Sequence, residues 1–286
     1  YETLRTQAKR LSYFSRVNYT LKDKYLFTAT FRADGSDKFG QGNRWGYFPS
    51  GAFAWKTSEE DFIKNIDEIS NLKMRLSYGV TGNERIPPYS YFSSMENAFY
   101  AHNGGQVLGI APSSLANENL KWETTTQYDA GVDLGLFNNR INLTVDYYLK
   151  ETSDMLLNAP VSAQSGYANQ VLNIGQINNS GWEISLSTTN IQTDNFSWNT
   201  DFNINFNRNE VIDLGGADFI PVVVSGGWLT TPGRVIVGES IGTMYGFVYD
   251  GVYQIDDFTW QNNSNATIPH DSRNYVLKPG VVDSQI

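Results

Sequence analysis

Hydrophobic and polar residues alternate one by one over several long stretches of this chain. In residues 122 to 136 the even positions are mostly apolar and the odd positions are polar or glycine. Residues 141 to 150 reverse the parity, and residues 196 to 208 repeat the pattern with an asparagine-rich polar face. Because successive side chains of an extended strand point to opposite faces, each stretch predicts a strand with one apolar face.

Weaker alternation predicts further strands, which bring the total to about nine, at 12 to 21, 25 to 33, 50 to 56, 72 to 80, 181 to 190 and 243 to 253. The short link Asn138-Asn139-Arg140 predicts that the strands on either side of it form a hairpin.

One short helix is predicted at 58 to 69. Residues 58 to 61 resemble a capping box, and apolar residues follow at helical spacing at Phe62, Ile63 and Ile66. The neighbouring carboxylates of Glu59, Glu60 and Asp61 are therefore assigned to helix capping and a solvated surface, and not to catalysis.

The connections between the predicted strands alternate between short and long. In chain order they are 22 to 24, 34 to 49, 57 to 71, 81 to 121, 137 to 140, 151 to 180, 191 to 195 and 209 to about 242. Short turns at one end and long loops at the other are typical of outer-membrane barrels, whose tilted strands cross about 30 Å of hydrocarbon. The predicted fold class is all-β, a transmembrane antiparallel up-and-down β-barrel.

This fold class predicts which face of the strands meets lipid. The side chains expected to point outward are Val132, Leu134, Ile141, Leu143, Val145, Ile204 and Phe206. Those expected to line the concave side are Asp129, Asp133, Asp146, Asn203 and Asn205. Aromatic residues beside the short turns predict a periplasmic girdle of Tyr25, Trp55, Phe137, Phe196 and Trp198.

Composition removes several classes of function. The chain has 286 residues, 21 Lys and Arg against 30 Asp and Glu, a net charge of −9 and no cysteine. A nucleic-acid partner is not expected without a basic face, and thiolate metal sites and cysteine nucleophiles are excluded. No catalytic, phosphate-binding or calcium-loop motif is present, so neither an enzyme nor a bound cofactor or metal is expected. The 40% hydrophobic content is that of a folded chain.

Several stretches resemble the barrel of the SusC/RagA-type TonB-linked outer-membrane proteins. The resemblance covers nearly the whole chain, in the order expected for the family. Its motifs are residues 12 to 19, 25 to 36, 43 to 50 (NRWGYFPS), 72 to 83, 120 to 125, 146 to 148, 154 to 157, 173 to 175, 238 to 242 and 246 to 251.

The resemblance implies a plugged barrel of about 22 strands in the outer membrane of a Gram-negative bacterium. It also implies TonB-dependent import of oligosaccharides or peptides, with a SusD-like surface lipoprotein and the TonB complex as partners. Residues 1 to 286 then correspond to part of the barrel domain, with the plug and the TonB box expected outside this stretch.

The long loops hold the candidate ligand-binding aromatics Tyr89, Tyr91 and Trp228. An inner face rich in uncharged hydrogen-bonding side chains favours an oligosaccharide over a peptide as the ligand. A secreted or periplasmic β-rich glycan-binding module is the alternative function. In that alternative the apolar strand faces pack into a protein core and do not meet lipid.

Overall fold

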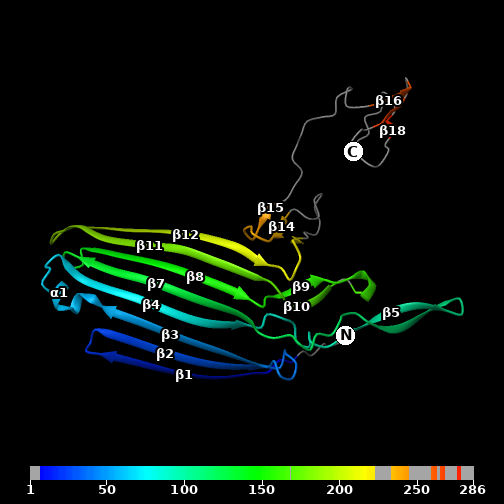
Figure 1. Ribbon diagram of the computed structural model, residues 1–286, viewed down its shortest axis with the longest axis horizontal. Coiled ribbons are helices and arrows are strands. Elements are labelled where there is room, and N and C mark those ends of the chain that lie inside the picture. Colours follow the sequence, from blue (N-terminus) through cyan, green and yellow to red (C-terminus); the bar gives the residue numbers. More distant parts are fainter. Residues whose placement is uncertain are drawn as a thin grey trace. The chain divides into compact units, whose positions relative to one another are not determined.

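The computed structural model describes residues 7–167, 169–222, 233–244, 259–262, 265–267 and 276–277. The chain divides into two units, Tyr1–Met244 and Tyr245–Ile286. In the first unit, eight strands form one antiparallel sheet in the order β1-β2-β3-β4-β7-β8-β11-β12 (Figure 1). Strands that follow one another along the chain are neighbours, apart from hairpins inserted between them. The predicted up-and-down connectivity is therefore confirmed.

Seven of the eight strands are longer than the alternation predicted, and β7 is one residue shorter. The eight strands are β1 (Arg10–Leu21), β2 (Tyr25–Ser36), β3 (Trp45–Lys56), β4 (Ile69–Asn83), β7 (Glu123–Leu136), β8 (Ile141–Ser153), β11 (Gln176–Gln192) and β12 (Ser197–Asp213). The predicted ninth strand, 243 to 253, extends outside the described residues. Its described part, β15 (Thr243–Met244), pairs with β14 (Gly233–Ile236) and not with the main sheet.

Three of the four long connections hold hairpins that were not predicted. These hairpins are β5 (Met95–His102) with β6 (Gly105–Pro112), β9 (Leu156–Pro160) with β10 (Asn169–Asn173), and β13 (Phe219–Val222) with β14. Pairing within each connection satisfies backbone groups that a loop would leave to water. In the second unit, β16 (Thr259–Asn262), β17 (Asn265–Thr267) and β18 (Val276–Leu277) pair in an antiparallel manner.

The predicted hairpin at 138 to 140 is confirmed. β7 pairs with β8, and Phe137, Asn138 and Asn139 turn the chain with φ values of 52°, 56° and 59°. Asparagine tolerates this left-handed region better than most residues, which explains the Asn-Asn pair at the turn.

The helix is shorter than predicted, and the proposed capping box is wrong. A 3₁₀ turn, η1 (Thr57–Glu59), precedes α1 (Asp61–Lys64), and no side chain caps either element. Glu60, the residue before α1, uses its carboxylate to accept hydrogen bonds from Tyr25 Oη (2.7 Å), Trp55 Nε1 (3.1 Å) and Lys24 Nζ (3.0 Å). Among the described residues, no helix is long and apolar enough to cross a membrane.

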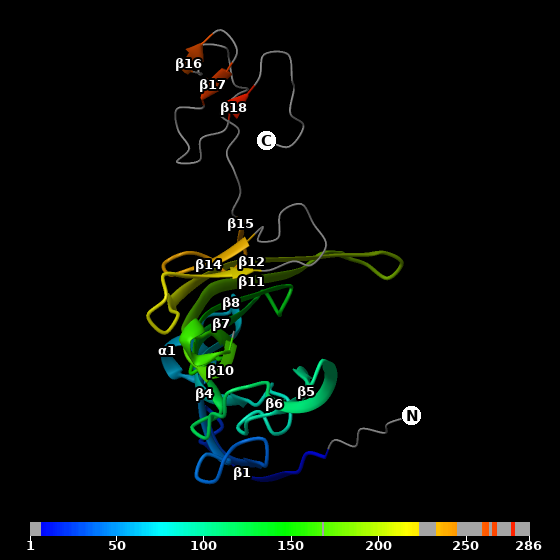
Figure 2. The same cartoon turned by 90° about the vertical axis from the view of Figure 1, so that its right-hand side faces the viewer.

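The sheet curves from β1 to β12 (Figure 2). Its two faces differ in chemistry. The register places Val145 opposite both Val132 and Ile184, in one continuous apolar face. The predicted separation of the apolar and polar sets is therefore confirmed. Leu76 and Phe206 on the apolar face are each 56% exposed. A soluble sheet packs its apolar face against a core, so this face needs another apolar environment.

Aromatic side chains gather at the end of the sheet where the short connections lie. The rings of Tyr25 and Trp55 stack with their centroids 6.3 Å apart. Phe137, Phe196 and Trp198 are each at least half exposed at this end. Their predicted location at one end is confirmed.

The three donors around Glu60, with Tyr25 Oη as the largest influence, hold the pKa of its carboxyl at about 2, below the ordinary 4.5. A carboxyl with a lowered pKa stabilises the fold fully above its unfolded-state pKa and loses that effect as the pH falls toward the folded value. In the full-length protein, we expect Glu60→Gln to lower the thermal midpoint at about pH 6. The difference from the parent should close between about pH 4.5 and 2.

The control is Glu59→Gln, because Glu59 is exposed and its neighbour Glu60 makes the bonds. It should leave the midpoint unchanged at every pH. A Glu60→Gln difference that does not vary with pH would contradict the assignment.

Candidate functional site

The polar face of the sheet carries opposite charges on its two halves. As far as Val211, positively charged positions of this face lie mainly on β1 to β4: Arg10, Arg16, Arg32, Lys56, Lys73 and Arg75, with one anion, Asp34. Negatively charged positions lie mainly on β7 to β12: Glu123, Asp129, Asp133, Asp146, Glu183 and Asp201, with one cation, Lys150. Such an arrangement produces an electric field directed across the face.

The two halves meet at Arg75. Its guanidinium donates from Nε to Asp133 Oδ2 (2.9 Å) and from Nη2 to Asp133 Oδ1 (3.0 Å). The Nη2 group also lies 2.9 Å from Asp146 Oδ1. Beside this network, Asp129 accepts from Ser77 Oγ (2.8 Å) and Gln127 Nε2 (2.7 Å). Two-point pairing fixes the orientation of the guanidinium, so the seam between β4 and β7 is a rigid charged patch.

A glycine makes room for this network. Gly131 is buried on the polar face of β7, and a Cβ added there would collide with Asp146 Oδ1 and approach Arg75 Nη2 to 2.8 Å. Its requirement is for space, because its φ lies outside the left-handed region. The Arg75 side chain therefore lies directly over the strand backbone.

Hollows on the polar face border these charges. One of about 390 Å³ is lined by Asp129, Tyr148, Lys150 and Glu183, together with Arg75. Another, of about 550 Å³, lies toward the long connections and is lined by Arg10, Arg32, Asp34, Glu84 and neighbouring side chains. Both hollows mix donors, acceptors and charges, which suits a hydrated polar ligand or a polar protein surface.

A small apolar core lies at the end of the sheet where the long connections begin. Phe39, Phe48, Ile86, Leu120 and Trp122 are buried together. Trp122 was predicted to belong to the apolar face of the strand, but it precedes β7 and donates from Nε1 to Arg44 O (3.1 Å). The prediction is wrong at this residue because a tertiary contact, and not the alternation, sets its position.

The predicted ligand-binding aromatics have different environments. Tyr89 is 53% exposed and has a φ of 68°. Its hydroxyl group donates a long hydrogen bond to Gln7 O (3.5 Å). Tyr91 packs partly buried against the core that contains Trp122. Trp228 lies outside the described residues.

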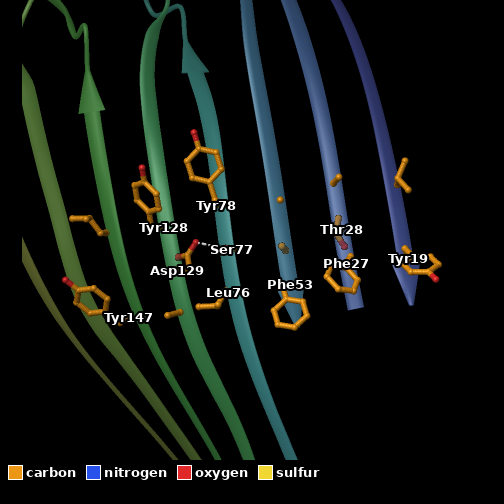
Figure 3. Close-up of a pocket in the computed structure, with 16 residues that line it drawn as sticks. Tyr19, Phe27, Thr28, Phe53, Leu76, Ser77, Tyr78, Tyr128, Asp129 and Tyr147 are labelled. Carbon is orange, nitrogen blue, oxygen red and sulfur yellow. Dashed lines mark hydrogen bonds between the residues drawn. The ribbon is translucent and has the colours of Figure 1, made fainter. Parts of the chain in front are cut away.

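The apolar face has a groove of its own, with a volume of about 730 Å³ (Figure 3). Tyr78, Tyr128 and Tyr147 lie along it, with Phe27 and Phe53 on the neighbouring strands. Small residues at Ala29, Gly51 and Ala130 form its floor. The groove is apolar, so it is a feature of the lipid-facing side and not of the polar site.

The roles of Arg75 and Glu60 were not predicted from the sequence, in which Glu60 was assigned only to helix capping and a solvated surface. A signal for Arg75 was present, because a charged residue at the middle of a membrane-crossing strand needs partners, and Asp133 and Asp146 have the matching parity. No comparable signal marked Glu60, since its partners come from β2, β3 and the turn before β2.

A sheet with a polar concave face and an apolar, almost uncharged outer face is the wall of an outer-membrane β-barrel. Within the eight strands as far as Val211, charge on the apolar face is confined to Glu151, Arg208 and Glu210, near the long connections. Residues 2–277 match the family described as "TonB dependent receptor-like, beta-barrel". The chain belongs to this family, and its location is the outer membrane of a Gram-negative bacterium.

Curated relatives agree with this family. TonB-dependent receptor P3 of Formosa agariphila is 40% identical over 268 residues, 93% of this chain and 26% of its own length. TonB-dependent receptor SusC of Bacteroides thetaiotaomicron is 36% identical over 290 residues, 96% of this chain and 29% of its own length. The family consists of receptors and not of enzymes. The chain spans about a quarter of the length of these relatives.

Solved structures show the same fold. The structure titled "RagAB peptide importer in the 'closed-closed' state" superposes with a TM-score of 0.75 and 27% identity, over 96% of this chain and 29% of that one. The structure titled "RagAB peptide transporter" gives 0.71 and 30% identity, over 81% and 25%.

Adjacent residues of β12 test which face meets lipid. Ile204 lies on the apolar face and Asn203 on the polar face. In the full-length protein folded into lipid vesicles, we expect Ile204→Arg to reduce the free energy of unfolding by about 2 to 4 kcal/mol, because the charge enters hydrocarbon. Urea unfolding followed by tryptophan fluorescence measures the change. The matched variant Asn203→Arg should reduce the free energy of unfolding far less, because its charge enters the polar side. Equal reductions for the two variants would contradict the assignment of faces.

Proposed function

We propose that this chain forms part of the barrel wall of a TonB-dependent importer that takes up oligosaccharides across the outer membrane. The observation that carries the proposal is the match of residues 2–277 to the receptor barrel family, on a sheet whose polar face is lined with hydrogen-bonding groups. Outer-membrane location favours an importer over the secreted or periplasmic glycan-binding module.

The eight-stranded sheet is proposed to be one arc of a larger barrel. β1 and β12 are the two edges of the described sheet, and each leaves a row of backbone groups without a partner strand. Lipid cannot satisfy such groups, so a functional barrel needs further strands to close it. The relatives are about four times as long, which leaves room for those strands and for a plug.

The polar face of β12 supports an oligosaccharide as the ligand. Asn203, Asn205 and Asn207 follow one another on this face, opposite Ser185, Glu183 and Gly181 of β11. Amides and hydroxyls both donate and accept hydrogen bonds, which suits a neutral ligand with many hydroxyl groups. The relative named SusC is similar to this chain over nearly all of it.

A peptide is the second candidate ligand. Opposite charges on the two halves of the polar face match the ammonium and carboxylate groups of a peptide. The structural neighbours are titled as a peptide transporter and a peptide importer. Uptake measurements distinguish the two ligands.

The proposed partners are a SusD-like surface lipoprotein, which would cap the long-connection end, and the TonB complex, which would supply energy through the rest of the protein. The printed name "TonB-dependent receptor SusC" supports the TonB complex as a partner, and the name RagAB in the titles of the solved structures supports an importer of two components.

Deletion of the gene tests the function. We expect growth to be lost on one class of oligosaccharide, restored by the full-length gene and lost again in a strain without TonB. Growth on peptides should not change. A defect on peptides alone, with normal growth on every glycan, would replace the oligosaccharide by the peptide, and no defect on either would contradict import.

Substitution of two tyrosines tests whether the connection between β4 and β7 binds the ligand. Tyr89 is exposed, so Tyr89→Ala should lower ligand affinity of the full-length protein by about 1 kcal/mol, roughly fivefold, with an unchanged thermal midpoint. Tyr91→Ala should lower the midpoint, because Tyr91 packs on the core. Titration calorimetry and thermal unfolding measure the two effects. An unchanged affinity for Tyr89→Ala would remove it from the ligand site.

A further inference from the structure

The connection between β3 and β4 carries exposed apolar side chains that no contact within the described residues explains. Phe62 in α1 is 67% exposed and Ile66, just after it, is 40% exposed. Residues four apart lie on the same side of a helical turn, and Ile66 N donates to Ile63 O (2.8 Å), which continues the turn. The connection therefore presents a small apolar surface, which we call the Phe62 surface and define as Phe62 and Ile66.

The position of Glu60 shows on which side of the sheet this surface lies. Tyr25 and Trp55 oppose each other in the register, on the same face as Phe27 and Phe53. Since Glu60 accepts hydrogen bonds from both Tyr25 and Trp55, the start of α1 is attached to the apolar side of the sheet. Figure 2 agrees, with α1 on the convex side and away from the hairpin β5–β6.

The connection is also fixed in place by its backbone. Lys56 N donates to Lys24 O (2.8 Å), and Phe137 N donates to Glu68 O (2.9 Å), so both ends are tied to neighbouring turns. Lys24 adds an ion pair to Glu60 at 3.0 Å, which raises the pKa of Lys24. A connection held at several points keeps the Phe62 surface in one position.

We infer that the Phe62 surface is a membrane anchor, which inserts into the boundary between headgroups and acyl chains of the leaflet at the short-connection end. Its occupant is a phospholipid surface, because the surface is continuous with the apolar face that meets lipid and adjoins the aromatic residues Tyr25 and Trp55. Short amphipathic segments bind membranes by burying such side chains about 5–10 Å into this boundary. The anchor sets the depth of the barrel end and does not depend on which ligand is imported.

A fluorescent reporter at residue 62 tests the anchor in the full-length protein. The chain contains no cysteine, so a single cysteine labelled with the environment-sensitive dye NBD can be placed in a variant with any other cysteines removed. The protein is reconstituted in phospholipid nanodiscs. Quenching by lipids with a shallow doxyl group reports contact with the membrane boundary, and quenching by iodide reports contact with water.

The control is Lys64→Cys. Lys64 is exposed and lies two residues from Phe62, about 200° around the helix, so its label should face water. We expect doxyl lipid to quench the Phe62→Cys label at least twofold more than the Lys64→Cys label, with the reverse order for iodide. Equal quenching by iodide at both positions would overturn the anchor. A Phe62→Cys label quenched by neither would also overturn it, since another part of the protein would then cover the surface.

Glu60→Ala in the Phe62→Cys background tests how the anchor is held. Without the carboxylate, the start of α1 loses its bonds to Tyr25, Trp55 and Lys24. Quenching by doxyl lipid should fall at least twofold while heat-resistant migration of the folded protein persists. Unchanged quenching would overturn the role of Glu60.

Discussion

Hydrocarbon offers no hydrogen-bonding partners, so a protein that crosses it has to pair its backbone groups internally. The side chains on its outer surface have to be apolar at the same time. Between its two edge strands, β1 and β12, the eight-stranded sheet meets both conditions. Neighbouring strands pair their backbones, and as far as Val211 the outer face carries charge only near the long connections. The charged residues lie on the other face, where Arg75 is paired with two aspartates. If water lay on both sides of the sheet, the apolar side chains of the outer face would be exposed to it, which is unfavourable.

The two ends of the sheet are built differently, as this constraint requires. At the short-connection end, tight turns and the Glu60 carboxylate bring neighbouring strands together within a few residues. At the other end, the connections are long enough to form their own hairpins and the small core around Trp122. Tight turns at one end and a larger surface built from hairpins at the other suit the proposed import of a ligand that enters at the long connections.

Alternation in the sequence was sufficient to predict the strands, their register faces and the hairpin at Asn138 and Asn139. It was sufficient because period two is a direct consequence of strand geometry and because a lipid-facing side enforces it. Prediction from the alternation failed where tertiary contacts set the position of a side chain. Trp122 continues the alternation but is drawn into a core, and Glu60 resembles a capping residue but bonds to two strands. The Arg75 network needed the register, since its partners lie 58 and 71 residues away in the chain.

A nitroxide scan of β8 distinguishes a lipid-facing apolar side from one that faces protein or water. One spin label at a time is placed from residue 142 to 149 in the full-length protein in bilayers. We expect the accessibility of the label to oxygen to be high at the odd positions, which meet lipid, and low at the even ones, with a period of two. Uniform accessibility to a water-soluble nickel reagent, or odd positions closed to both reagents, would contradict this expectation.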